Sequence, residues 1–237
     1  MTKIYLKLIG FGVLLTLLIS IFSALGIILK LDNDNFLLLQ IIAFAIATVT
    51  LIFYMQKKGH SLQPFGFKKG KCNPIFIIFM LIITSIQPVV MGINHSLSLK
   101  TIVLIIIQML LVGFVEETLF RSIYLFFLSV NTKRYILFSS VVFGLLHVAT
   151  GINPEFPMVL VILQIVNALL LGIVFALLYL KTQTIYTTIF FHAGFNILAS
   201  VSLDNSINNQ ILSVSILVVF YIIFIFFLLK KERTLNI

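Results

Sequence analysis

Five ionisable residues lie inside long apolar stretches of the sequence, where an ionised side chain is costly. They are Glu116, Glu117, Arg121, His147 and His192. A charged residue at the centre of a membrane helix costs about 2.5–3.5 kcal/mol on translocon scales, so each of these residues needs a partner or a function. A carboxylate close to imidazoles can activate water. We therefore consider hydrolysis first.

Helical spacing separates the roles of the two glutamates. Glu117 and Arg121 are four residues apart and share one face of a helix, which favours a structural salt bridge between them. Glu116 points roughly 100° away from Glu117, so Arg121 cannot easily satisfy both carboxylates. Glu116 is left in need of another partner and is the candidate general base.

The two histidines each share a helix face with a second useful side chain. Phe143 precedes His147 by four residues, and His192 precedes Asn196 by four. His147 could share the proton of the attacking water with Glu116. His192 and Asn196 could donate hydrogen bonds to the oxyanion that develops on a scissile carbonyl. Taken singly, each pair is more typical of helix packing.

Depth supports a joint role for these residues. At 1.5 Å per residue, Glu116 lies about 21 Å, His147 about 20 Å and His192 about 16 Å from the expected cytoplasmic ends of their helices. Helices that run in alternate directions thus carry all three residues to one level. Scattered structural polar residues would seldom align in this way.

The composition of the chain indicates which kind of element carries these ionisable residues. The chain of 237 residues is 61% hydrophobic and 10% charged, far from the composition of a soluble domain. Long uncharged runs approach the roughly 20 residues that cross a bilayer as a helix. We predict an all-α, polytopic membrane helix bundle that forms one integral membrane domain, 1–237, with a catalytic core at about 100–200. The eight expected spans are 8–29, 36–55, 75–93, 101–128, 135–150, 158–180, 184–203 and 211–229.

The basic residues give the orientation. Thirteen of the sixteen fall in alternate connections and at both chain ends, whereas the other set of connections holds only Lys30 and Lys100. The thirteen are Lys3, Lys7, Lys57, Lys58, Lys68, Lys69, Lys71, Lys133, Arg134, Lys181, Lys230, Lys231 and Arg233. This bias predicts that the N-terminus and the C-terminus are both cytoplasmic. Topology explains the net charge of +9 without a nucleic-acid partner.

The longest cytoplasmic connection, from Gln56 to Asn73, contains five of these lysines. It could lie along the anionic inner leaflet or be a solvated loop. The single Cys72 excludes an internal disulfide.

Three segments resemble the motifs of a known family. The segments Glu116 to Arg121, Phe143 to His147 and His192 to Asn196 are similar to the Glu-Glu-x-x-x-Arg, Phe-x-x-x-His and His-x-x-x-Asn motifs of the CAAX-type intramembrane endopeptidases, also called the Abi or CPBP family. The resemblance implies a protease that hydrolyses a peptide bond of a membrane-associated protein or peptide. It also implies that Glu116 and His147 activate water and that His192 and Asn196 stabilise the oxyanion, with Glu117, Arg121 and Phe143 supporting the site.

The resemblance leaves the substrate open. Relatives that are similar to prenyl-protein proteases trim lipidated CAAX proteins, and bacterial relatives are linked to bacteriocin immunity, peptide maturation and membrane-protein processing. A compositional bias toward Ile, Lys, Asn and Phe suggests an AT-rich genome, and thus a bacterial cell membrane.

Three alternatives stay open at this point. Glu116, His147 and His192 could hold a catalytic zinc ion, although a mechanism without a cofactor is preferred because Asn196 suits a donor better than a ligand. A non-enzymatic immunity or scaffold protein could share the fold. A transporter could also carry such residues, but it would more usually show two similar halves and interrupted helices, which are not evident here.

Overall fold

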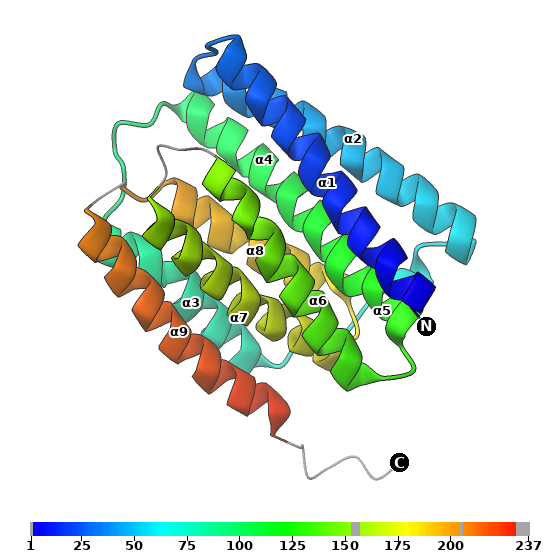
Figure 1. Cartoon of the computed structure of the whole chain (residues 1–237). Helices are drawn as coiled ribbons and strands as arrows, with labels where there is room; N and C mark the ends of the chain where they lie inside the picture. The colour runs from blue at the N-terminus through cyan, green and yellow to red at the C-terminus, as the bar shows by residue number, and fades with distance from the viewer. Residues whose placement is uncertain (1, 153–156, 204–205, 231–237) are drawn as a thin grey trace.

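The computed structural model of the chain describes residues 2–152, 157–203 and 206–230, so Lys231 and Arg233 lie outside the described residues. The described part consists of helices with short connections (Figure 1). The α-helices are α1 (Thr2–Ile28), α2 (Asn33–Gly59), α3 (Pro74–Met91), α4 (Leu99–Glu117), α5 (Tyr124–Leu128), α6 (Thr132–Leu146), α7 (Met158–Thr182), α8 (Ile185–Ser200) and α9 (Ile207–Leu229). Three shorter helices are η1 (Gln63–Phe65), η2 (Thr118–Ile123) and η3 (His147–Ile152).

The predicted all-α membrane bundle is confirmed. Each of the eight expected spans corresponds to one helical rod, with α4, η2 and α5 forming one rod and α6 and η3 another. Within the described residues, seven rods are long and apolar enough to cross a membrane. The eighth, α8, has 16 residues and packs on α3, α4 and α7 in the interior of the bundle.

Polar residues that interrupt the apolar runs start several of the helices. The side chains of Asp32, Asn73, Ser98 and Asn131 each accept a hydrogen bond from a backbone N–H in the first turn of α2, α3, α4 and α6. These are N-caps, which satisfy donors that a helix start would otherwise leave unpaired. The connections read from the sequence therefore fall close to the true helix ends.

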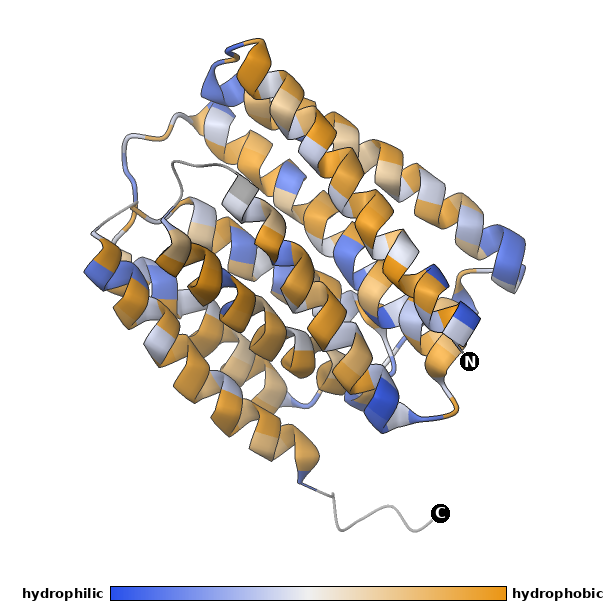
Figure 2. Ribbon diagram, viewed as in Figure 1, coloured by the Kyte–Doolittle hydropathy of each residue, from blue (hydrophilic) through white to orange (hydrophobic). Residues whose placement is uncertain are grey.

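Hydrophobic residues predominate along the helices, and many of the hydrophilic residues lie at the two ends of the bundle (Figure 2). Phe53, Val89 and Phe226 are each more than two-thirds exposed, which suits contact with lipid rather than water. In Figure 1, α1, α2 and α4 lie on one side of the bundle and α3, α7 and α9 on the other. The start of α1, the end of α2 and the α5–α6 junction lie at one end of the bundle.

The lysines of the connection from Gln56 to Asn73 are exposed, but the connection is not a simple surface loop. Its centre inserts between the helix ends, where Phe65 is completely buried and its carbonyl accepts a hydrogen bond from the Ser122 hydroxyl. Gly66, with φ of +84°, lies directly against the Tyr179 side chain, so a Cβ would not fit there. The Gly66 carbonyl also accepts a hydrogen bond of 3.0 Å from the Ile185 N–H at the start of α8.

Candidate active site

The helix that carries the two glutamates changes its winding immediately after them. Glu116 and Glu117 end α4, and the six residues of η2 that follow form a π-helical turn whose side chains are all buried. A regular α-helix was expected through this region. The turn contains neither Pro nor Gly, and Leu119, Phe120 and Ile123 continue the apolar run, so the sequence does not reveal the change of winding. Such π-turns occur frequently at functional sites.

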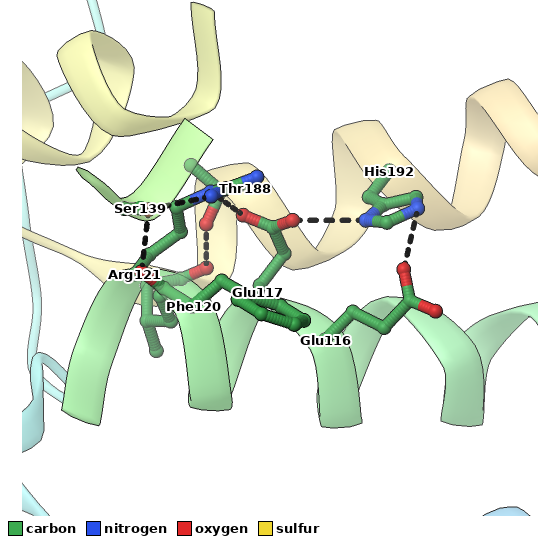
Figure 3. A network of polar contacts seen from close by, with 8 residues as sticks. Glu116, Glu117, Phe120, Arg121, Ser139, Thr188 and His192 are labelled. Atoms are coloured by element: carbon green, nitrogen blue, oxygen red, sulfur yellow. Dashed lines mark hydrogen bonds and ion pairs between the residues drawn. The ribbon is translucent and has the colours of Figure 1, made fainter. Parts of the chain in front are cut away.

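Arg121 is held by a network of polar contacts (Figure 3). Its Nε lies 3.2 Å from Glu117 Oε2 and its Nη1 donates to Ser139 Oγ at 2.8 Å. Ser139 in turn donates to the Phe120 carbonyl at 2.7 Å. Arg121 and Glu117 are completely buried, and the guanidinium lies over the Phe143 ring. The salt bridge expected from the spacing is therefore present, and the hydrogen bonds of Ser139 tie η2 to α6.

Glu117 has a second contact that intrahelical spacing could not reveal. Its Oε1 lies 2.9 Å from His192 Nδ1, on α8. Because the carboxylate only accepts, Nδ1 is assigned as the donor. The imidazole is 4% exposed and stacks on Phe175. Glu117 therefore links Arg121 to His192 and fixes the orientation of the ring.

Glu116 finds its partner on the other side of the same imidazole (Figure 3). Its Oε2 lies 3.6 Å from His192 Nε2, and its side chain is 20% exposed, unlike that of its neighbour. His192 thus lies between two carboxylates. Counting Glu116 and Glu117 against Arg121 leaves one negative charge, which an imidazolium at His192 would balance.

His147 occupies the junction of α6 and η3. Its Nδ1 lies 2.8 Å from the Phe143 carbonyl, which can only accept, so Nδ1 is assigned as the donor, and in a neutral ring Nε2 would be the nitrogen that accepts. The Phe143 ring contacts both imidazoles, with centroid separations of 4.9 Å to His147 and 6.0 Å to His192. Phe143 therefore supports the site by contact with both histidines as well as with Arg121.

Two cavities meet at these residues. The first, of about 850 Å³, is lined by Glu116, His147, His192 and Asn196, among others. The second, of about 780 Å³, lies against α1 and shares Glu116, Phe143 and His147 with the first. Glu116 and His147 therefore stand where the two cavities join. Asn196 is one turn beyond His192 on α8 and faces the same space.

The arrangement does not fit a three-ligand zinc site. Within the described part of the chain, no group of three His, Cys, Asp or Glu side chains is placed to hold a metal ion. We derive no chemical step through a metal. That the reaction needs no cofactor stays a prediction.

Comparison with known proteins bears on the same region. Residues 98–198 match the family described as type II CAAX prenyl endopeptidase Rce1-like. The match spans all three motifs and confirms the resemblance drawn from them. No curated protein and no solved structure matches the chain significantly.

Proposed function

Because residues 98–198 match the type II CAAX prenyl endopeptidase family, we propose that the protein is an intramembrane endopeptidase that hydrolyses a peptide bond of a membrane-associated protein or peptide. The observation that carries the proposal is the position of Glu116: it is a partly exposed carboxylate, 3.6 Å from a buried imidazole, at the junction of two cavities.

Water activation is assigned to Glu116 and His147. A water molecule in the shared space would donate one hydrogen bond to the Glu116 carboxylate and another to the unprotonated Nε2 of His147. As the water oxygen attacks the scissile carbonyl carbon, its proton passes to this pair, which later protonates the leaving amine. General acid–base catalysis of this kind contributes about 10²–10⁴-fold to a rate.

Oxyanion stabilisation is assigned to His192 and Asn196. With Nδ1 held by Glu117, His192 can donate from Nε2 only as the imidazolium, the form that balances the charge of the cluster. The cationic His192 and the Asn196 amide would then both donate hydrogen bonds to the developing oxyanion, in a site with little water. Removal of one such donor typically costs about 10²–10³-fold in kcat.

Glu117 and Arg121 are positioning residues in this proposal. Neither side chain is exposed, so neither can meet the substrate. The carboxylate of Glu117 holds the His192 ring, and the guanidinium holds the carboxylate. The ring is therefore oriented before substrate binds, which lowers the reorganisation that the reaction requires.

The test is a comparison of membrane-peptide termini in cells that express the wild-type chain or Glu116→Gln at the same level. Termini that are present with the wild type and absent with the variant support the proposal. Identical termini, with the cellular role of the protein retained, would instead favour a non-enzymatic immunity or scaffold protein of the same fold.

A further inference from the structure

Both cavities lie in one half of the bundle. The larger one extends from Glu116, His147 and His192 toward the last turns of α3 and α8 and the first turns of α7 and α9, where Met91, Leu160, Gln164, Ser200 and Ile207 line it. The smaller cavity is lined along α1 from Leu15 to Ile27, in the second half of that helix. All of these segments approach the end of the bundle that carries the connections after α1, α3 and α8.

The opposite end of the bundle, on the other side of the candidate site, is closed. The segment around η1 inserts there, with Phe65 buried against η2 through the Ser122 hydrogen bond. Tyr179 of α7 packs on Gly66, and the Lys71 N–H donates to the Thr182 carbonyl at 3.2 Å. No lining residue of either cavity comes from this segment.

Charge assigns a side of the membrane to each end. The closed end carries Lys57, Lys58, Lys133, Arg134 and Lys181, whereas the open end carries Lys30 and Lys100. Lys100 is moreover paired with Asp34 at 3.0 Å. Under the positive-inside rule, the closed end is cytoplasmic and the open end faces the other side.

From this juxtaposition we infer that the site is reached from the extracytoplasmic side of the membrane, so that its substrate is a peptide segment whose cleaved bond lies in the outer half of the bilayer or just beyond it. The inference about the side from which the site is reached rests on the cavities and the charge distribution alone. The statement about the substrate rests also on the proposed protease function.

The lining of the larger cavity suits such a peptide. Gln87, Gln164, Asn167 and Asn196 contribute carboxamides to its wall. Carboxamides carry both donors and acceptors and can pair with the backbone of an extended peptide, which has no other way to satisfy its N–H and C=O groups within a bilayer.

Thiol labelling of the full chain in intact cells tests the opening. In a Cys72→Ser background, Gln164→Cys places a thiol on the cavity wall and Val166→Cys places one on the exposed outer face of the same helix. Both positions lie only about 9–12 Å along the helix from Met158. A charged, membrane-impermeant thiosulfonate reacts with the thiolate, which forms in water and not in lipid.

We expect Gln164→Cys to react in intact cells roughly tenfold or more faster than Val166→Cys, because only the cavity supplies water to the thiol. In the wild-type chain, the exposed Cys72 should react only after the cells are permeabilised. Labelling of Cys72 in intact cells, or a Gln164→Cys thiol that reacts only after permeabilisation or not at all, would overturn the inference. If Gln164→Cys does not accumulate, Ser200→Cys at the mouth of the cavity serves in its place.

The substrate path is tested with the same reagent. Modification of Ser200→Cys from outside should block cleavage, whereas modification of His95→Cys, in an exposed loop at the same end, should not. Cleavage that continues after complete modification of Ser200→Cys would refute the proposed path. Failure of the protease proposal itself is distinguishable, because Glu116→Gln would then leave peptide termini unchanged while the labelling pattern persists.

Discussion

At the scale of single residues, two adjacent glutamates have different surroundings. Glu117 is completely buried and bridges Arg121 and His192, whereas Glu116 borders both cavities. The difference arises because neighbouring helical residues point roughly 100° apart. In the proposed mechanism, Glu117 maintains the site and Glu116 meets the substrate.

Replacing Glu116 by Gln should abolish cleavage with little effect on folding. The amide keeps the size of the side chain but cannot accept the proton of water, so we expect a loss of about 10²–10⁴-fold in the rate. The rate is measured on purified protein with a peptide substrate identified from the comparison of termini. A rate within threefold of the wild type would contradict the assignment of the general base.

Replacing Glu117 by Gln should instead reduce the stability of the protein. It leaves the buried Arg121 charge without its partner, and breaking a buried ion pair in this way costs about 3–5 kcal/mol. We expect lower abundance and a lower Tm in detergent than for Glu116→Gln.

A double variant separates positioning from folding. Glu117→Gln combined with Arg121→Met removes both charges and should recover most of the stability. Cleavage should stay low, because nothing then holds the His192 ring. Recovery of both stability and cleavage would show that Glu117 serves the fold alone.

At the scale of elements, the site depends on the close approach of α4 and α8. A Cβ on Gly113 would lie 2.8 Å from the Ile189 carbonyl oxygen and 3.1 Å from the Ala193 nitrogen, both of them backbone atoms of α8. Glycine therefore permits the spacing at which Glu116 and Glu117 reach His192.

Gly113→Ala should push α8 away and impair both stability and cleavage. We expect a cost of about 1–3 kcal/mol from overpacking, together with a fall in kcat that exceeds any change in KM. Gly194→Ala is the matched control, because a Cβ at Gly194, on α8 itself, meets nothing within 4 Å. Similar defects in the two variants, measured as Tm and cleavage rate, would contradict this account.

The elements themselves could largely be predicted from the sequence, because hydrophobic length and polar interruptions determine where membrane helices start and end. The Glu117–Arg121 pair could also be predicted, since both residues lie on one helix. The contact between Glu117 and His192 could not, because it depends on how two helices pack. The π-turn was missed for a different reason: it alters backbone hydrogen bonding while leaving the apolar pattern intact. The inserted connection around Phe65 was missed because its lysines dominate its composition.

At the scale of the whole molecule, the inserted connection joins the ends of several helices that the charge distribution predicts to be cytoplasmic. Phe65→Ala should release it, because the truncation leaves a cavity where a completely buried ring packs; such changes cost about 3–5 kcal/mol in well-packed cores. Lys68, Lys69 and Lys71 are exposed in the wild type but belong to a segment that is held in place. Because Phe65→Ala releases this segment, trypsin applied to the predicted cytoplasmic face should cleave the variant faster than the wild type. Equal rates of cleavage would show that the segment does not depend on Phe65.

The different roles proposed for the two glutamates also have an evolutionary consequence. Under the proposed mechanism, a change in the codon of Glu116 would yield an inactive protein that still folds and inserts. The same change in the next codon would deplete the protein from the membrane. Inactive paralogues of this chain should therefore lose the first glutamate and retain the second, together with Arg121 and Ser139.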